Sequence, residues 1–358
     1  MPSREVAMSQ IQTESQPART LRLQNGQVYH FESNESVEAD EIPVIDVSGM
    51  YSERLEDRQA VAEKVREAAH RIGFFYIVGH GIDPSRAENA FAQAKRFFAL
   101  DEEKKMEVYT GLVPNEFVGY HPMKHYNRNA LAQKDLSEAF NWSYEPAADP
   151  DAVNRDAQSI SIWPSDLPGF KEGLLGYYTP LLQLARRLAR VFALALHLPE
   201  HSFDQYVERP EAGMRILHYP QQDLSPDEQA GLGAHTDFEC WTIVSQDSCG
   251  GLEVLNKAGR WIRAKPVAGS FVVNIADCFM RQTNDFFVST VHRVVNKSGR
   301  ERFSAPFFFG FDRSKLLEPV STCVSEDNPM KYPIVTAGEY YKWRANKAKT
   351  GNAELKLQ

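Results

Sequence analysis

The sequence predicts a mainly β fold with flanking α-helices, organised around a compact antiparallel barrel. Between Leu232 and Asp312, short runs rich in β-branched and aromatic residues are separated by Gly, Asn and Asp turns, which is typical of such a barrel. Before and after this stretch, apolar residues recur at helical spacing instead. With 358 residues, of which 42% are hydrophobic, the chain is long enough for one large core with helical additions.

The first part of the chain predicts an arm followed by alternating helices and strands. Residues 1–40 are rich in Gln, Ser and Glu and predict a flexible, loosely ordered arm with a short strand near Val28–Phe31. Apolar residues at helical spacing then predict a helix that Gly73 stops. Residues 74–78 form a buried strand, and Asp83 opens a second helix.

Two further helices complete the predicted flanking structure. Thr179 and Pro180 are a good helix start, because a hydroxyl can cap the helix and proline suits its first turn. The apolar residues that follow predict a long scaffold helix packed on the barrel. Thr336 and Glu339 form a capping box that opens the last helix. The Asp- and Pro-rich residues 146–168 read as a linker.

Beyond the arm, we expect a single domain over residues 41–358. Its divisions are a mostly helical N-terminal part at 41–200, a barrel core at 210–312 and a C-terminal helix region at 313–358. No internal repeat and no second catalytic motif is evident.

The composition excludes several classes of function. The net charge is −8 and there is no basic cluster, so we expect no nucleic-acid partner. There is no run of about 18 or more apolar residues, and the N-terminus lacks the pattern of a signal peptide. Cys240, Cys249, Cys278 and Cys323 have no CxxC spacing and predict reduced thiols. We therefore expect a cytoplasmic protein without membrane contact; the sequence makes no prediction of oligomeric state.

Three residues of the barrel form a candidate metal site. His235 and Asp237 lie two positions apart, so that in a strand both side chains face the same side. His292 completes the site only if the fold brings its strand alongside. Two neutral imidazoles and one carboxylate form the facial triad of non-haem Fe(II) oxygenases, which leaves adjacent positions for dioxygen and a bidentate co-substrate. A structural zinc site would need four protein ligands, usually thiolates.

The two histidines also have purely structural interpretations. A second pair of residues favours the metal site instead. His235 could be a strand-edge histidine bonded to a nearby carboxylate, and His292 could be a core histidine in an apolar run. Arg302 and Ser304, however, again lie two positions apart, and a guanidinium with a hydroxyl beside it can bind a carboxylate. In a strand that continues into Ala305–Phe309, an inward-facing arginine needs an anionic partner.

An ordered series of motifs resembles a known family. The series comprises Gly73-Phe74-Phe75, His80-Gly81-Ile82, His235-Thr236-Asp237, Gly250-Gly251-Leu252, Asn274-Ile275-Ala276-Asp277, His292-Arg293-Val294 and Arg302-Phe303-Ser304. In this combination the chain resembles the 2-oxoglutarate/Fe(II)-dependent dioxygenase superfamily, and within it the branch of isopenicillin N synthase and the plant flavonoid and gibberellin oxygenases. The resemblance makes His80 a structural residue rather than a ligand.

The resemblance implies a fold, a set of cofactors and a reaction. The fold is a distorted double-stranded β-helix, or jelly roll, in which His235, Asp237 and His292 bind the catalytic Fe(II). 2-Oxoglutarate and O2 are the co-substrates, and ascorbate is a potential stimulant. Tyr219, Arg302 and Ser304 would hold the distal carboxylate of 2-oxoglutarate. The implied reaction hydroxylates a C–H bond of a small molecule, or oxidises it by desaturation, ring closure or ring expansion.

Five residues are candidates for substrate binding: Phe117, Tyr120, Arg215, Glu239 and Phe308. Strand alternation puts Arg215 on the same face as Tyr219, and Glu239 toward the metal. Together the five would suit a moderately sized aromatic or polycyclic molecule with a polar handle. As an alternative, Glu239 is an ion-pair partner of Arg215 or Arg281. Many relatives have an asparagine where Leu217 stands and a small residue where Glu239 stands, and Leu217 would therefore offer the co-substrate fewer contacts.

Three alternatives stay open at this point. Residues 112–129 are either a surface loop or, by the resemblance, a lid beside the substrate; this segment and the Pro-rich insertions resemble fungal or bacterial secondary-metabolite enzymes. The enzyme could instead be a 2-oxoglutarate-independent oxidase like isopenicillin N synthase, which uses the same Arg-x-Ser pair for its substrate's carboxylate. It could also be a non-catalytic jelly-roll receptor for a small molecule. Succinate formation separates the first two functions, and iron binding separates both from the third.

Overall fold

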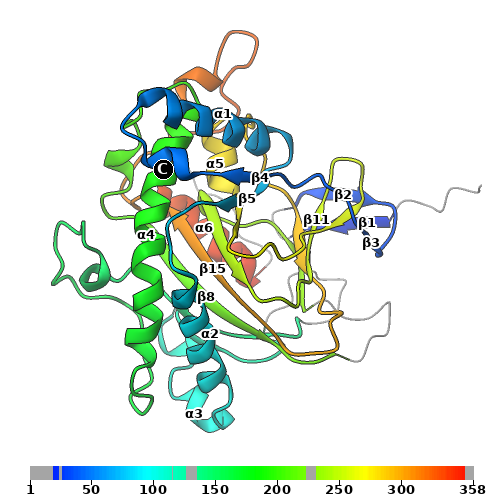
Figure 1. Cartoon of the computed structure of the whole chain (residues 1–358), viewed down its shortest axis with the longest axis vertical. Coiled ribbons are helices and arrows are strands. Elements are labelled where there is room, and N and C mark those ends of the chain that lie inside the picture. The colour runs from blue at the N-terminus through cyan, green and yellow to red at the C-terminus, as the bar shows by residue number, and fades with distance from the viewer. Residues whose placement is uncertain (1–18, 24–25, 115, 126–134, 223–230, 351–358) are drawn as a thin grey trace, which may run out of the picture.

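Two β-sheets packed against each other form the centre of the computed structural model, which describes residues 19–23, 26–114, 116–125, 135–222 and 231–350 (Figure 1). The larger sheet has eight strands in the order β4-β5-β13-β10-β15-β8-β7-β6, and the smaller has five in the order β3-β12-β11-β14-β9. Neighbouring strands are antiparallel, except that β4 pairs with β5 and β3 with β12 in parallel.

The larger sheet comprises β4 (Val44–Asp46), β5 (Phe74–Val78), β6 (Gly119–His121), β7 (Glu138–Trp142), β8 (Glu211–Tyr219), β10 (Trp241–Gln246), β13 (Phe271–Ile275) and β15 (Arg302–Gly310). The smaller comprises β3 (Ser36–Val37), β9 (Leu232–His235), β11 (Leu252–Leu255), β12 (Trp261–Arg263) and β14 (His292–Val294). The helices are α1 (Leu55–Arg71), α2 (Pro84–Phe98), α3 (Glu102–Met106), α4 (Phe170–Ala195), α5 (Asp277–Gln282) and α6 (Ala337–Thr350).

The space between the two sheets is filled by apolar side chains from both. Leu217 and Val272 come from the larger sheet, Val254 and Val294 from the smaller, and all four belong to one buried cluster. Burial of apolar surface between two sheets of a jelly roll is the main force that holds such a core together. The predicted mainly β fold with a jelly-roll core is therefore confirmed.

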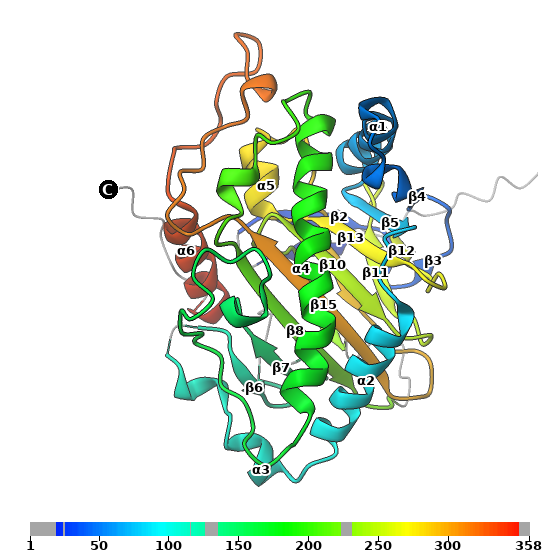
Figure 2. The same cartoon turned by 60° about the vertical axis from the view of Figure 1, so that its left-hand side comes forward.

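Helix α4 covers the outer face of the larger sheet, with α1 and α2 packed beside it (Figure 2). On α4, the ring centroid of Phe192 lies 4.9 Å from that of Trp241 and 5.2 Å from that of Phe279. Such aromatic contacts add to the burial energy of an already apolar interface. The scaffold helix predicted from the sequence is thus present.

The predicted start of this helix at Thr179 and Pro180 is wrong. Helix α4 begins at Phe170, directly after Gly169 in a left-handed conformation, and Pro180 lies in its interior. Proline lacks the N–H that would bond the carbonyl four residues earlier. That carbonyl, of Gly176, accepts a hydrogen bond from Nη1 of Arg86 at 2.6 Å instead, which offsets the loss. The hydroxyl of Thr179 donates to the carbonyl of Ala148 and caps nothing.

The other predicted helix signals are confirmed. The carboxylate of Asp83 accepts a hydrogen bond from the backbone N–H of Ser85 at the start of α2. Before α6, the Thr336 hydroxyl accepts from the N–H of Glu339 at 3.1 Å, and the Glu339 carboxylate accepts from the N–H of Thr336 at 2.7 Å. This reciprocal pair is a capping box.

The expectation of a loosely ordered arm over residues 1–40 requires correction in its second half. Strands β1 (Arg19–Arg22) and β2 (Val28–Phe31) form a hairpin, and β3 then adds to the smaller sheet beside β12. The hairpin is held because it buries Leu21 and Leu23 against Leu255 and Trp261. The short strand predicted near residue 28 is present, whereas residues 1–18 lie outside the described part of the chain.

All four cysteines carry free thiols, as predicted, and Cys240 and Cys278 are buried. Burial, together with the neighbouring Cys278 thiol, raises the pKa of Cys240, which keeps it protonated and unreactive. Among the residues that the structure describes, no helix has the length and apolar character needed to cross a membrane.

Two arginines one turn apart on α4 allow a test of buried against exposed ion pairs. Arg186 binds both carboxylate oxygens of the fully buried Asp149, at 2.6 and 2.7 Å. We expect Arg186→Met to lower the free energy of unfolding by about 3–5 kcal/mol, because it leaves a buried charge without its partner. Denaturant unfolding followed by circular dichroism measures this change.

Arg190→Met is the matched control, because the Arg190–Asp204 pair is well exposed and should contribute about 1 kcal/mol or less. Burial alone would raise the pKa of Asp149, but hydrogen bonds from Arg186 and Tyr144 outweigh it and hold the pKa below its ordinary value. The stability that Asp149 contributes is therefore present above its unfolded pKa and is lost as the pH falls through the folded pKa. A cost of Arg186→Met that is no larger than that of Arg190→Met would contradict the prediction.

Candidate metal centre and active site

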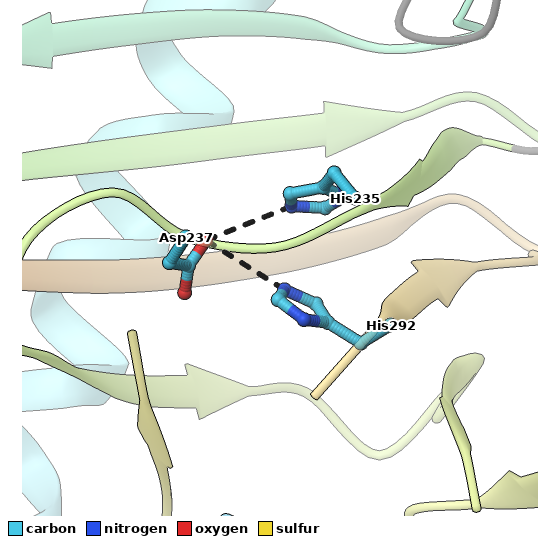
Figure 3. A group of neighbouring side chains, drawn as sticks. All are labelled: His235, Asp237 and His292. Atoms are coloured by element: carbon cyan, nitrogen blue, oxygen red, sulfur yellow. Dashed lines mark ion pairs between the residues drawn. The ribbon is translucent and has the colours of Figure 1, made fainter. Parts of the chain in front are cut away.

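His235, Asp237 and His292 converge on one point between the two sheets (Figure 3). His235 ends β9 and His292 begins β14, and the two strands pair so that these residues lie opposite each other. Nε2 of each histidine lies 3.7 Å from Oδ1 of Asp237, and one ligand atom from each of the three residues lies within 4.8 Å of the others. Two imidazoles and one carboxylate are thus placed to bind one metal ion on adjacent positions.

Backbone carbonyls fix the orientation of both imidazole rings. Nδ1 of His235 lies 2.8 Å from the carbonyl of Gly233, and Nδ1 of His292 lies 3.1 Å from that of Thr290. A carbonyl can only accept, so each Nδ1 carries the proton. The lone pair of each Nε2 is therefore directed at the metal position, which is how metal-binding histidines are usually held.

Two uncharged donors hold the carboxylate of Asp237. Its Oδ2 atom accepts from the hydroxyl of Thr242 at 2.6 Å and from the side-chain amide of Asn274 at 2.7 Å. Oδ1 is thereby left facing the two histidines. No local pattern in the sequence indicated a role for Thr242 or Asn274. They meet because they are cross-strand neighbours on β10 and β13, a register that spacing along the chain does not reveal.

Arg302 is buried in the same cavity wall as the metal ligands, and its hydrogen-bond partners among the described residues are neutral. Its side chain is 1% exposed; Nε donates to the carbonyl of Gly250, and Nη2 donates to the amide oxygen of Gln246 at 3.3 Å. Nη1 is buried and has no hydrogen-bond partner within the described residues. A buried guanidinium without a carboxylate beside it is costly unless an anion binds there, so the residue fits the distal carboxylate of 2-oxoglutarate.

Tyr219 and Ser304 lie next to Arg302, as the family resemblance implies. Tyr219 is the cross-strand neighbour of Arg302, and the guanidinium lies 4.7 Å from the centre of its ring. Ser304 pairs with Leu217, whose apolar side chain belongs to the cluster between the sheets. Gly231 makes room for the tyrosine, because a Cβ there would lie 2.7 Å from the ring. All three predicted co-substrate residues line the same cavity as the metal ligands.

Four of the five residues predicted to bind substrate also line this cavity: Phe117, Arg215, Glu239 and Phe308. The cavity wall contains further residues that the sequence analysis did not single out: Leu23 from the N-terminal hairpin, Asn141 and Trp142 from β7, and Tyr341, Arg344 and Lys347 from α6. Segments far apart in the chain supply them, so no local pattern indicated them. Residues 126–129 of the expected lid lie outside the described part of the chain, and the lid stays a prediction.

The prediction for Tyr120 is wrong, because its side chain faces the helices. Its hydroxyl donates to Glu138 at 2.7 Å, and its ring packs edge-on against Phe97. Tyr120 is the cross-strand neighbour of Phe140, and neighbours in a sheet share a face. Phe140 belongs to the cluster beneath α4, so Tyr120 lies there too.

Glu239 forms an ion pair with neither of the arginines considered for it, within the part of the chain described. Arg281 donates instead to the carbonyl of Pro333 and packs on Tyr332. Burial and the nearby carboxylate of Asp237 raise the pKa of Glu239 to about 8 in the chain alone. A cation bound by Asp237 would oppose this shift.

Comparison with known proteins agrees with this geometry. Residues 42–166 match the N-terminal family described as "non-haem dioxygenase in morphine synthesis", and residues 210–311 match the 2OG-Fe(II) oxygenase superfamily. The 2-oxoglutarate-Fe(II) type oxidoreductase ppzC of Metarhizium majus is 39% identical over 324 residues, covering 85% of this chain and 86% of the relative. The chain belongs to the 2OG-Fe(II) oxygenase superfamily.

Two further relatives illustrate the range of proteins that this chain is similar to. Kihadalactone A synthase LFS of Citrus sinensis is 31% identical over 317 residues, covering 85% of this chain and 93% of the relative. A Neurospora crassa protein whose crystal structure contains α-ketoglutarate and thymine superposes with a TM-score of 0.76 at 26% identity, covering 87% of this chain and 99% of that one. The protein is thus an Fe(II)- and 2-oxoglutarate-dependent oxygenase of the branch that resembles isopenicillin N synthase.

Removing one support of Asp237 should weaken metal binding. We expect Thr242→Val to lower Fe(II) affinity by about 10- to 100-fold, because the carboxylate loses a donor that holds Oδ1 toward the metal. Anaerobic titration with Fe(II) or Co(II) measures the affinity. Thr242→Ser keeps the hydroxyl and should bind metal like the unmodified protein. Equal losses in both variants would show that the hydroxyl is not the cause.

Proposed function

We propose that this oxygenase oxidises a C–H bond of an aromatic or polycyclic small molecule with a polar handle, as a step of secondary metabolism. The reaction is a hydroxylation or, at the same site, a desaturation, ring closure or ring expansion. The observation that carries the proposal is the pairing of Arg215 with Asn141 in the cavity wall.

Arg215 and the co-substrate residue Tyr219 lie on the same strand, β8, four residues apart. Gly213, Arg215, Leu217 and Tyr219 all line the cavity, because alternate residues of a strand share a face. At about 3.3 Å per residue, Arg215 lies roughly 13 Å along the strand from Tyr219. This spacing supports a division of the cavity into a 2-oxoglutarate end near Tyr219 and a substrate end near Arg215.

Asn141 offers a hydrogen-bond acceptor that the described protein residues do not use. Its side chain is 6% exposed, and its Oδ1 atom is buried without a hydrogen-bond partner in the described part of the chain. An unsatisfied buried acceptor costs free energy until a ligand donates to it. Because Asn141 and Arg215 are cross-strand neighbours in the cavity wall, their amide and guanidinium together suit a substrate group with both a donor and an acceptor, such as a carboxylic acid or a cyclic amide.

The ligands of relatives support a small ring compound. The Neurospora crassa protein binds thymine, a planar ring with adjacent N–H and C=O groups, and LFS is named for the synthesis of kihadalactone A. In this chain, Phe117 and Phe308 provide aromatic wall for the apolar part of such a molecule.

When bound, Fe(II) and 2-oxoglutarate would activate O2 for oxidation of the substrate. The chain positions the reactants and excludes water. His235, Asp237 and His292 would hold the metal, and Arg302 with Ser304 would hold the distal carboxylate of 2-oxoglutarate. Arg215 and Asn141 would then fix the polar handle, so that one C–H bond of the substrate faces the metal.

Succinate release from 2-oxoglutarate tests the proposal. Anaerobically iron-loaded protein is exposed to air alone and with a panel of aromatic acids, lactones, pyrimidine bases and cyclic amides. We expect one class to stimulate succinate release by about 10-fold or more, because a bound substrate couples co-substrate turnover to its own oxidation. His235→Ala and Arg302→Ala should abolish it.

The outcomes separate the competing functions. Substrate-stimulated succinate that is lost in both variants supports the oxygenase with this substrate class. Iron binding and substrate oxidation without succinate would instead favour an oxidase of the isopenicillin N synthase type. A protein that binds the small molecule but no iron would be a receptor, and the proposal would then be wrong.

Gly213 allows the substrate end to be narrowed selectively. A Cβ at this position would meet only the carbonyl of Trp142, at 3.5 Å, so a larger side chain is tolerated by the backbone and enters the cavity. We expect Gly213→Val to lower substrate-stimulated succinate release by about 10- to 100-fold, with 2-oxoglutarate affinity unchanged.

Gly176→Ala serves as a control for this variant, because that glycine has open space around it and lies on α4, outside the cavity wall. Full activity of Gly213→Val with every substrate of the panel would show that the substrate does not bind at the Arg215 end of the cavity.

A further inference from the structure

The carboxylate of Asp277 lies between the two segments that carry the metal ligands. Asp277 is the first residue of α5 and is 5% exposed. It is not one of the residues assigned to substrate or co-substrate. Its backbone N–H donates to the carbonyl of Asp237 at 3.1 Å. The residue is thus joined directly to the loop of the first two ligands.

Each oxygen of this carboxylate holds a different segment. Oδ2 accepts from the hydroxyl of Thr236, the residue between His235 and Asp237, at 3.0 Å. Oδ1 accepts from the hydroxyl of Ser289, three residues before His292, at 2.6 Å. Both hydroxyl residues are buried, so these hydrogen bonds are not in competition with bulk water. One carboxylate therefore links β9 and the approach to β14 across the metal position.

The C-terminal helix compensates the charge of Asp277. Nη2 of Arg344, on α6, lies 2.6 Å from Oδ2 of Asp277, and the side chains of the pair are 5% and 7% exposed. The Arg344 guanidinium also lies 4.6 Å from the ring centre of Phe238, which follows Asp237. A buried carboxylate of this kind needs both a cation and further hydrogen bonds, and Asp277 has both.

Helix α6 is at the same time part of the cavity wall. Tyr341, Arg344 and Lys347 all line the cavity. The start of the helix is fixed by its capping box and by a hydrogen bond from the N–H of Gly338 to the carbonyl of Arg313. The helix that borders the substrate space thus also reaches the support of the metal loop.

We propose that Asp277 is a positioning residue that holds the two ligand-bearing segments of the metal centre at their spacing, and that Arg344 makes the C-terminal helix part of this support. The hydroxyls of Thr236 and Ser289 transmit the restraint to His235, Asp237 and His292. The proposal rests on the metal centre assigned above and adds to it a support from outside the jelly roll.

Metal affinity tests this role, because a residue that only stabilises the fold would not change it in folded protein. Full-length protein is titrated anaerobically with Fe(II), and separately with Co(II) followed by visible absorption, well below the unfolding temperature of the least stable variant. We expect Thr236→Val, Ser289→Ala and Arg344→Met each to weaken binding by about 10-fold or more, as loss of a partner around a metal ligand usually does. Thr236→Ser keeps the hydroxyl and should bind normally.

Arg186→Met is the matched control, because it breaks another buried arginine–aspartate pair, on α4 and away from the cavity wall. It should lower the melting temperature and leave metal affinity unchanged. If Arg344→Met does not fold, the two hydroxyl variants, which lose one atom or exchange it for a methyl group, still decide the question.

Two results would overturn the proposal. Affinities of Thr236→Val, Ser289→Ala and Arg344→Met within about two-fold of the unmodified protein would make the network structural only. Equal weakening by Arg186→Met would attribute the effect to general destabilisation. If the unmodified protein itself bound neither metal, the metal centre would be wrong, a failure distinct from that of the network.

Discussion

The active site depends on the antiparallel pairing of β9 with β14, which places His235 opposite His292. Their ring centroids are 4.2 Å apart, close enough for both Nε2 atoms to face one carboxylate oxygen. Side chains in a strand alternate between faces, so a slip of one residue would turn an imidazole away from the metal position. Backbone carbonyls on both histidines, and Thr242 and Asn274 on Asp237, then fix the three ligands within this register.

The buried charged side chains are of two kinds: some are paired with an opposite charge within the chain, and one, Arg302, is positioned to pair with a bound anion. Asp277 has Arg344 and two hydroxyls, and Asp149 has Arg186, so both carboxylates are compensated within the chain. Arg302 differs, because its partners in the described residues are a carbonyl and an amide oxygen. Burial of an uncompensated guanidinium is unfavourable without an anion, and the distal carboxylate of 2-oxoglutarate would provide one. The same physical rule thus separates the structural charges from the functional one.

A single strand, β8, builds both the core and the cavity. Ile216 faces the cluster beneath α4, whereas Arg215 and Leu217 face the opposite side. The helices behind the sheet therefore hold the strand whose opposite face lines the cavity. The C-terminal helix contributes from the other direction, since it borders the cavity and binds Asp277. Together these contacts enclose the site between the larger sheet and the C-terminal helix α6.

Local spacing in the sequence was sufficient for much of this protein. Alternation and turn residues predicted the β core, and the i, i+2 spacing predicted that Arg302 and Ser304 share a face of β15, whereas Asp237 lies beyond the end of β9. The capping box before α6 was equally predictable from the sequence, because both of its hydrogen bonds join residues three positions apart. What the sequence left undecided or predicted wrongly was non-local. The burial of Tyr120 on the helix side, the pairing of Thr242 with Asn274, the retention of Pro180 inside α4 and the contact of Arg344 with Asp277 all depend on neighbours from other elements. Strand register and helix docking are set by the packing of the whole chain, and only the tertiary structure decided them.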